Sequence, residues 1–280
     1  MQLQIACIQL NPGNDLDANL QAAQAAVMEA AAQGAQLVAL PEFTAFLDRS
    51  GRAMAQAALP EESHPAVSFF QELARSASVW LMLGSVAVRE SAGGERLCNR
   101  SFAIAPDGRI VARYDKIHMF DVVLPSGRAI QESRTYRPGT QAPIVDTPWG
   151  AIGMTICYDL RFPQLYRALA QGGADVLMVP SAFAFETGSV HWQPLLQARA
   201  IETGCFVVAA ATCGAHPGEW RTWGHAMVVD PWGRILAQAD DQPGVLMATL
   251  DLAAVPRARA AIPSLGTRNE FDIVHVPGVA

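Results

Sequence analysis

The sequence of 280 residues predicts an α/β domain of two similar halves, whose sheets pack face to face with helices on the outside. Short apolar runs typical of strands alternate with amphipathic stretches typical of helices along the chain. Two short segments have similar counterparts later in the chain: 34–41 resembles 173–180, and 106–110 resembles 231–235. No linker rich in Pro, Gly or Ser separates the halves, so we expect residues 1–280 to form a single domain.

The first half begins with a strand over 3–9 and an amphipathic helix over 16–33. Gly34 ends that helix, since glycine is favoured just after a helix terminus. A buried strand over 36–40 follows and runs directly into Glu42. The remaining elements expected in this half are a helix over 65–77 and strands over 79–88, 97–105 and 109–115.

Residues 116–141 predict a long polar connection with little regular pattern. Loops of that length inside a compact domain are often functional. A strand over 150–156 then ends at Cys157, and a helix begins at Pro163. The remaining expected elements are a strand over 175–179, a helix over 191–203, a strand over 205–211 and a hairpin with strands near 225–230 and 234–238.

Composition limits the classes of protein to consider. The chain is 51% hydrophobic and 16% charged, which predicts a sizeable core rather than disorder. A net charge of −6 argues against a nucleic-acid partner, which would need a basic face. The N-terminus lacks the basic segment of a signal peptide, and no apolar run approaches the roughly 20 residues that span a bilayer. We therefore expect a cytoplasmic protein that binds neither nucleic acid nor membrane.

The chain contains five cysteines, an odd count, and no pair has the spacing of a metal or redox motif. This pattern fits free thiols in a reducing compartment better than a disulfide framework or a zinc site. Metal-binding and nucleotide-binding motifs are also missing from the sequence, so we expect neither a metal nor a cofactor. The cysteines are Cys7, Cys98, Cys157, Cys205 and Cys213.

Lysine is nearly absent, because the chain has 20 Lys and Arg residues together and only Lys116 is a lysine. One interpretation is chance. The other is that this position needs a compact ammonium, which the bulky planar guanidinium of Arg cannot replace. The surrounding phrase, 114–118, favours the second interpretation.

Cys157 stands at the end of an expected central strand, just before a helix. Such a turn exposes a side chain on a rigid base, and backbone N–H groups point toward it. A thiol is a strong nucleophile only as thiolate, so a nearby Lys would help by lowering its pKa and a carboxylate could take its proton. The alternative is a buried structural cysteine, which is how we interpret the other four.

Two glutamates are candidate acid–base groups. Glu42 follows a buried apolar run and is expected, half-buried, at the end of a strand. Burial raises the pKa of a carboxylate toward the range that is useful for acid–base catalysis. Glu132 lies in the polar connection that follows Lys116. For each of them the alternative is a solvated loop charge. His118, His191 and His225 have no recognisable catalytic partner, and we interpret them as structural or supporting residues.

The combined phrases resemble the nitrilase superfamily of carbon–nitrogen hydrolases over nearly the whole chain. The matching phrases are 40–42, 115–118, 131–133, 157–163 and 228–233. The resemblance implies a four-layer αββα sandwich of the nitrilase type, without metal or cofactor. It also implies a homodimer or a larger even-numbered homo-oligomer.

The resemblance also implies the roles of individual residues. Cys157 would be the nucleophile, Glu42 the general base and acid, and Lys116 the group that stabilises the oxyanion. Glu132 would be a further site glutamate that orients Lys116 or the substrate. The backbone N–H of Tyr158 would be a second donor to the oxyanion.

Further phrases are similar to the branch of the superfamily that holds deaminated glutathione amidases and ω-amidases. They are 181–183, 187–188, 191–192, 198–203 and 223–225. This implies hydrolysis of a terminal carboxamide to an acid and ammonia through a cysteine thioester, with deaminated glutathione as the first candidate substrate. The alternatives are an ω-amidase acting on α-ketoglutaramate, another amidase or N-carbamoyl hydrolase of the superfamily, and a catalytically silent binding protein.

Candidate substrate-binding residues lie close to these phrases. Phe183, Thr187 and Trp192 are expected to line the pocket, unless they only pack beneath a loop. Arg161 is suited to hold a substrate carboxylate through two parallel hydrogen bonds. An internal ion pair of Arg161 with Asp159 or Glu202 is the alternative.

Overall fold

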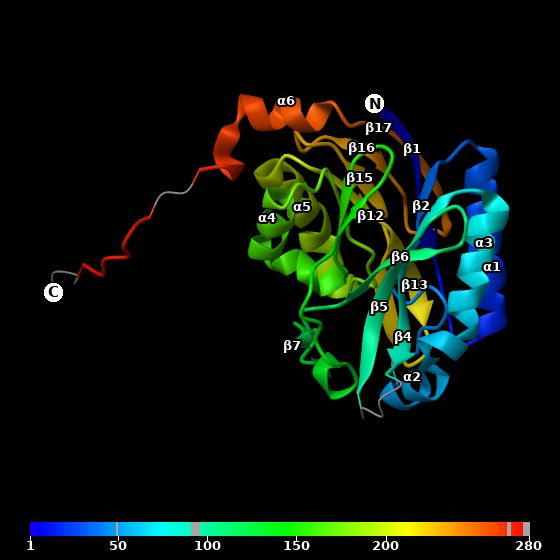
Figure 1. The fold of residues 1–280 in the computed structure, drawn as a ribbon. Helices are drawn as coiled ribbons and strands as arrows, with labels where there is room; N and C mark the ends of the chain where they lie inside the picture. Colours follow the sequence, from blue (N-terminus) through cyan, green and yellow to red (C-terminus); the bar gives the residue numbers. More distant parts are fainter. Residues whose placement is uncertain (49, 91–95, 268–269, 277–280) are drawn as a thin grey trace.

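The computed structural model describes residues 1–48, 50–90, 96–267 and 270–276. Two sheets pack against each other, and helices cover their outer faces (Figure 1). The helices on the first sheet are α1 (Leu16–Ala32) and α3 (Pro65–Ala77), and those on the second are α4 (Pro163–Gln171) and α5 (Phe185–Thr203). This arrangement confirms the predicted four-layer αββα sandwich.

The first sheet contains both early and late parts of the chain. Its order is β14-β13-β1-β2-β4-β5-β6, with β17 beside β1 and β3 beside β4. The strands are β1 (Gln2–Leu10), β2 (Leu37–Ala39), β3 (Leu59–Pro60), β4 (Trp80–Arg89), β5 (Leu97–Ile104), β6 (Ile110–Asp115), β13 (Ala211–His216), β14 (Trp220–Trp223) and β17 (Gly244–Asp251). In this sheet β17 runs antiparallel to β1 along almost its full length, from Gln2 opposite Asp251 to Gln9 opposite Gly244.

The second sheet has the order β16-β15-β12-β11-β10-β9. Its strands are β9 (Ile144–Asp146), β10 (Ala151–Met154), β11 (Val176–Met178), β12 (Phe206–Ala209), β15 (Met227–Val229) and β16 (Ile235–Gln238). Strands β10, β11 and β12 run parallel, as do β1, β2 and β4 in the first sheet. Parallel strands place their carboxyl ends at one edge, where sites form in α/β proteins.

Alternation along β1 shows how the layers form. Ile5 and Cys7 belong to the core shared with the second sheet, whereas Ala6 and Ile8 pack into the core beneath α1 and α3. Successive side chains of a strand point to opposite faces, so one apolar run supplies two cores. This explains why the strand reads as continuously hydrophobic.

The two sequence repeats occupy equivalent places in the two halves. Strands β2 and β11 each follow a helix and end just before a Pro-containing segment. The hairpins β5–β6 and β15–β16 turn at Gly108 and Gly233, whose φ angles are 80° and 83°. Only glycine adopts this left-handed conformation without strain, so the shared glycine marks the same turn.

Two expectations about element boundaries are wrong. The helix predicted over 191–203 begins at Phe185 and continues through Gly188 and Pro194. A side chain at Gly188 would collide with Trp223, so close packing keeps this breaker residue inside the helix. The connection over 116–141 is not irregular, because it holds a hairpin of β7 (Asp121–Val123) and β8 (Ala129–Gln131).

Other elements were not predicted. The strand expected over 205–211 is divided, since β12 ends at Ala209 in the second sheet and β13 begins at Ala211 in the first. Because the sequence stays apolar from β12 into β13, it gives no sign that the chain passes from one sheet to the other. The further unpredicted elements are α2 (Gly51–Ala57), α6 (Ala254–Ala261), β3, β9, β14, β17 and the short 3-10 helices η1 (Glu61–Ser63), η2 (Glu132–Arg134), η3 (Cys157–Arg161) and η4 (Pro263–Leu265).

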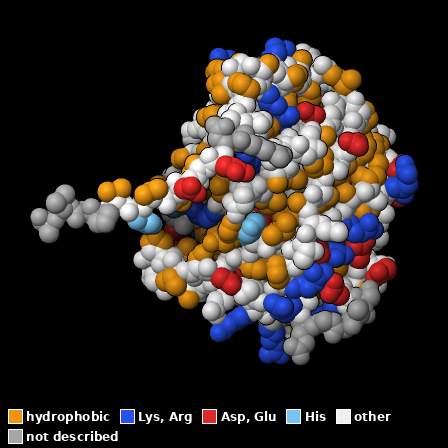
Figure 2. Space-filling model, turned by 60° about the vertical axis from the view of Figure 1, so that its left-hand side comes forward, with side chains coloured by type: hydrophobic (Ala, Val, Ile, Leu, Met, Phe, Trp, Pro, Cys, Tyr) orange, Lys and Arg blue, Asp and Glu red, His pale blue; other side chains and the backbone are white. Residues whose placement is uncertain are grey.

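The final described segment, 270–276, extends away from the body of the protein (Figures 1 and 2). Its hydrophobic side chains are exposed, including Phe271 and Val276. Within the described ranges of the chain, no helix has both the length and the hydrophobicity needed to cross a membrane.

Candidate active site

Four predicted residues meet at the ends of strands from both sheets. Glu42 follows β2, Lys116 follows β6 and Cys157 follows β10, while Glu132 begins η2 after β8. We call these four residues the reactive cluster. All four are largely or fully buried, so their charges interact in a medium much less polar than water.

The turn that carries Glu42 is held by β4. A side chain at Gly84 would collide with the carbonyl oxygens of Leu40 and Pro41, so this close approach requires glycine. Ser85 Oγ accepts a hydrogen bond from the N–H of Phe43 at 3.0 Å, and Phe43 has a strained φ of 55°. Several backbone contacts of this turn therefore fix the position of the Glu42 carboxylate.

The Glu42 carboxylate accepts hydrogen bonds from both halves of the protein. Oε2 accepts from the N–H of Ala182 at 2.7 Å, in the segment after β11. Oε1 accepts from Asn99 Nδ2 at 2.8 Å and from Lys116 Nζ at 3.1 Å, both from the first half. The carboxylate thus bridges the ends of two sheets.

The Lys116 ammonium lies between two carboxylates. Its side chain is 2% exposed, and Nζ contacts Glu42 Oε1 at 3.1 Å and Glu132 Oε2 at 2.9 Å. Burial by itself acts to lower the pKa of Lys116, but the charges of Glu132, Glu42 and Cys157 raise it well above its usual value. The ammonium therefore keeps its proton through the neutral pH range.

Glu132 is the second carboxylate that holds the Lys116 ammonium. Its two oxygens accept from Lys116 Nζ at 3.0 and 2.9 Å, and Oε2 also accepts from the N–H of Phe120 at 2.6 Å. The carboxylate is therefore occupied by the ammonium and by the backbone of the β7–β8 segment. This geometry suits an orienting group better than a proton carrier.

Cys157 lies in a strained turn between β10 and η3. Its φ is 48°, a conformation that few non-glycine residues adopt, and its N–H donates to the carbonyl of Pro180 at 2.9 Å. As the second residue of η3, Tyr158 has a backbone N–H without a partner inside the helix, because the first N–H groups of any helix lack one. This donor and the thiol belong to consecutive residues of the same turn.

The resting protonation state of Cys157 differs from expectation. Burial, and then the Glu42 charge, raise the pKa of the Cys157 thiol well above its usual value. Lys116 acts to lower that pKa, as predicted, but its contribution does not prevail. The residue therefore rests as a thiol beside the Glu42 carboxylate.

Sequence reasoning missed the function of Asp159. This fully buried carboxylate accepts from Tyr114 Oη at 2.6 Å, from the N–H of His118 at 3.0 Å and from the N–H of Ile156 at 2.9 Å. His118 Nδ1 lies 2.7 Å from Oδ1, the oxygen that also accepts from the His118 N–H. Asp159 thereby ties the segment that carries Lys116 to the turn that carries Cys157.

Asn99 was also missed. Its Nδ2 donates to Glu42 Oε1 at 2.8 Å and lies 3.4 Å from Glu132 Oε1, and its carbonyl accepts from the N–H of Lys116 at 3.0 Å. The available signal was a fully buried polar residue inside the apolar strand β5, because such residues are rarely without a specific partner.

The proposed ion pairs of Arg161 are wrong. Asp159 is occupied as described above, and Glu202 pairs with Arg199 at 2.7 Å. Arg161 instead lies 3.3 Å from His191 Nδ1, with its guanidinium over the Phe183 ring.

A narrow cavity, here called the inner cavity, opens onto the reactive cluster. Four predicted pocket residues line it, namely Tyr158, Arg161, Phe183 and Thr187, and it also exposes Phe43, Phe120, Ala182, Ala184 and Trp220. Trp192 does not line it. The Trp192 side chain is buried behind Phe183, with ring centroids 5.1 Å apart, and its Nε1 donates to the carbonyl of His225 at 2.7 Å.

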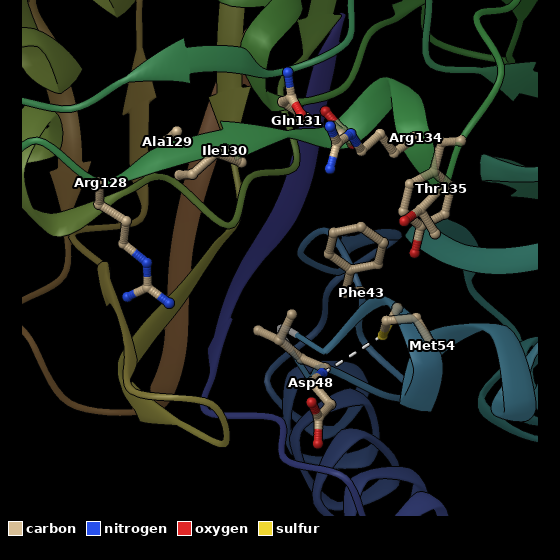
Figure 3. A pocket seen from close by; sticks show the side chains of 12 residues that line it. Phe43, Asp48, Met54, Arg128, Ala129, Ile130, Gln131, Arg134 and Thr135 are labelled. Atoms are coloured by element: carbon tan, nitrogen blue, oxygen red, sulfur yellow. Dashed lines mark hydrogen bonds between the residues drawn. The ribbon is translucent and has the colours of Figure 1, made fainter.

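A second and larger hollow of about 420 Å³ adjoins the inner cavity (Figure 3). We call it the outer cleft. It shares Phe43 and Glu132 with the inner cavity, and its other walls come from β8 with η2 and from the segment that includes α2. Its remaining lining residues are Leu47, Asp48, Met54, Arg128, Ala129, Ile130, Gln131, Arg134, Thr135 and Tyr136.

Comparison with known proteins identifies the family. A family model described as carbon-nitrogen hydrolase matches residues 4–260. The chain belongs to the carbon–nitrogen hydrolase family. The resemblance inferred from the phrases is thereby confirmed. In the described part of this hydrolase, no group of three or more His, Cys, Asp or Glu residues is arranged to hold a metal ion.

Named relatives and solved structures agree with this assignment. The hydrolase is 41% identical over 265 residues to a protein of Synechocystis sp. named deaminated glutathione amidase, covering 94% of this chain and 97% of the relative. The NitFhit protein of Caenorhabditis elegans superimposes with a TM-score of 0.88 at 37% identity. That match covers 95% of this chain but only 65% of NitFhit.

A third comparison concerns chemistry. A mutant of the amidase from Nesterenkonia sp. AN1 matches with a TM-score of 0.79 and 29% identity, over 92% of this chain and 94% of the other. That structure shows the acetamide moiety of fluoroacetamide added covalently at the active-site cysteine of the Nesterenkonia enzyme.

Proposed function

We propose that this hydrolase cleaves an amide through a thioester on Cys157, with Glu42 as base and acid. Lys116 stabilises the oxyanion in this proposal, and Glu132 orients Lys116. The observation that carries it is the buried contact of Lys116 Nζ with both carboxylates, in a cavity that Cys157 also lines.

The first chemical step joins the thiol to the amide carbon. Glu42 takes the proton of Cys157 as the sulfur attacks, so no free thiolate has to exist in the resting enzyme. The carbonyl oxygen becomes an oxyanion that the Lys116 ammonium and the Tyr158 N–H stabilise. Loss of one such donor typically costs about 3–4 kcal/mol of the activation barrier.

The second step expels the amine. Protonated Glu42 gives its proton to the amide nitrogen, the carbon–nitrogen bond breaks, and an acyl thioester remains on Cys157. Glu42 then takes a proton from water, which attacks the thioester. Return of that proton to sulfur releases the acid and restores the thiol.

As substrate we propose deaminated glutathione, in agreement with the name of the Synechocystis relative. Arg161 in the inner cavity offers a planar guanidinium for the carboxylate of the oxo acid portion. The scissile bond of this substrate is a secondary amide, so the product besides α-ketoglutarate is cysteinylglycine. The expected release of ammonia therefore applies only to primary amides such as α-ketoglutaramate.

Product analysis tests this proposal. We expect purified enzyme to release α-ketoglutarate from deaminated glutathione faster than ammonia from α-ketoglutaramate at matched concentrations. Cys157→Ala should abolish both reactions. Faster reaction of α-ketoglutaramate would indicate an ω-amidase, and undiminished activity of Cys157→Ala would exclude the thioester mechanism.

We also propose a cytoplasmic homodimer or larger even-numbered assembly. Five free, buried cysteines support a reducing compartment. Exposed Ile201, Trp232 and Ile262 line a hollow of about 270 Å³ beside α5 and α6, which supports a contact with another copy. Sedimentation of the wild type and of Trp232→Glu tests this, since the substitution should favour monomers.

A further inference from the structure

The outer cleft is large, and it borders the reactive cluster at Glu132. The narrower inner cavity is lined by the cluster itself and by Arg161, so it borders the atoms that react. An amide with a long leaving group needs a second space on the other side of the scissile bond. The outer cleft supplies that space, because Phe43 and Glu132 belong to both hollows.

One wall of the outer cleft is cationic. Arg128 and Arg134 come from the wall formed by β8 and η2, whereas Phe43, Met54 and Asp48 come from the opposite wall (Figure 3). The Asp48 carboxylate accepts from the N–H of Ser50 at 2.8 Å and from Asn14 at 3.1 Å. Glu132 is paired with Lys116, and Arg128 and Arg134 supply two positive charges along the β8–η2 wall.

The two arginines differ in their availability. Arg128 donates to the carbonyls of Glu219 at 2.7 Å and Gly218 at 3.2 Å, and its guanidinium lies over the Trp220 ring. Arg134 is exposed and forms no hydrogen bond or ion pair with another residue of the described chain. Its five donors therefore remain open to a ligand.

The arginines also differ in distance from the reacting atoms. Arg134 is two residues beyond Glu132 in η2, where each residue advances about 2 Å. Arg128 is four residues before Glu132, directly ahead of β8, a backbone separation of up to about 13 Å. A leaving group of two residues reaches about 7 Å from the scissile nitrogen. The shorter backbone separation from Glu132 therefore favours Arg134 over Arg128 as the partner of its terminal carboxylate.

We propose that the outer cleft is the subsite for the leaving group and that Arg134 binds its terminal carboxylate. The ligand class is a dipeptide, or a similar short amine, that ends in a carboxylate. Apolar contacts with Phe43 and Met54 would hold its cysteinyl side chain. This inference rests on the proposed amidase function and names the part of the substrate that the reactive cluster does not bind.

The test compares substrates that differ only in the leaving group. For each enzyme we take the ratio of kcat/KM for deaminated glutathione to kcat/KM for α-ketoglutaramate, which lacks the dipeptide. Arg134→Gln should lower this ratio about tenfold, through a higher KM, because a hydrogen-bonded charge pair is lost. Arg109→Gln, in the hairpin turn outside the cleft, is the matched control and should leave the ratio unchanged.

A chemical variant of the substrate sharpens the test. Deaminated glutathione with its glycine carboxylate amidated should react about tenfold more slowly with wild-type enzyme, measured as α-ketoglutarate release. The Arg134→Gln enzyme should not distinguish the two forms. If wild type treats both forms alike, or if Arg134→Gln keeps the wild-type ratio, the inference is overturned.

Binding to an inactive enzyme separates this inference from the proposed function. Calorimetry with Cys157→Ala gives the Kd of deaminated glutathione without turnover, and adding Arg134→Gln should raise that Kd about tenfold. If the Kd rises in this way but the wild-type enzyme hydrolyses neither substrate, the proposed function is refuted and the subsite is retained. An unchanged Kd would refute the subsite and leave the amidase function intact.

Discussion

The reactive cluster and the outer cleft share Glu132, yet they are held in different ways. In the cluster each charged group is buried and has several fixed partners within about 3 Å. In the outer cleft the arginines are exposed, and Arg134 has no partner among the described residues. Charge interactions are strong where water is excluded and weak where it is not. Changes in the cluster should therefore reduce turnover, whereas changes in the cleft should adjust affinity.

The largest effect is expected for Lys116→Arg. The guanidinium keeps the charge but cannot place one donor at a single oxygen between two carboxylates. We expect kcat to fall roughly 10²- to 10³-fold, the usual loss when an oxyanion donor is removed. Circular dichroism should show a folded protein. Wild-type kinetics from this variant would refute the assignment of Lys116.

A smaller loss is expected for Asn99→Ala. The substitution removes a hydrogen bond to the Glu42 carboxylate, worth about 1.5–3 kcal/mol when one partner is charged. We therefore expect kcat to fall roughly 10- to 100-fold with little change in KM. If Tm falls while kcat per folded molecule is unchanged, Asn99 has only a structural function.

The pH dependence of thiol modification tests the resting state of Cys157. Because burial and the Glu42 charge raise the pKa of the Cys157 thiol, the thiolate fraction at pH 7 is smaller than in a free cysteine. Reaction with methyl methanethiolsulfonate should be slower at pH 7 than that of a free cysteine, and its rate should still increase above pH 9. Mass spectrometry of the peptide that holds Cys157 measures this rate. A plateau below pH 8 would show instead that the ion pair with Lys116 dominates.

The smallest effect is expected for Arg128→Gln. This arginine lines the cleft, but its guanidinium already donates to two backbone carbonyls and lies over the Trp220 ring. We expect KM for deaminated glutathione to rise by no more than about threefold, as for other exposed charges. A loss equal to that of Arg134→Gln would mean that the carboxylate binds farther along β8.

The same contrast explains what could be predicted from the sequence. Each residue of the reactive cluster lies in a recognisable phrase, and Glu42 and Cys157 follow apolar strands whose ends meet at one edge of a sheet. The walls of the outer cleft come from α2 and from the β7–β8 hairpin, which are too short to show a periodic pattern. Their approach depends on packing between distant segments, so Arg134 carried no signal.

Supporting residues were missed for a related reason. Asn99 and Asp159 act through partners that are far away in the sequence, and only the fold brings those partners together. Trp192 was placed in the pocket because it lies in the phrase 191–192, which is similar to the amidase branch, but its side chain is buried behind the Phe183 ring.

The pairing of β17 with β1 has a consequence for biosynthesis. β1 is the first strand to leave the ribosome, and β2 can pair with one of its edges soon afterwards. Most of its other edge pairs with β17, residues 244–251, which are made much later. Until that late segment is made, β1 exposes an unpaired edge with hydrophobic residues on both faces, and such edges invite association with other chains. The nascent protein should therefore depend on chaperones for most of its synthesis, and truncation before residue 244 should yield aggregates rather than a smaller stable domain.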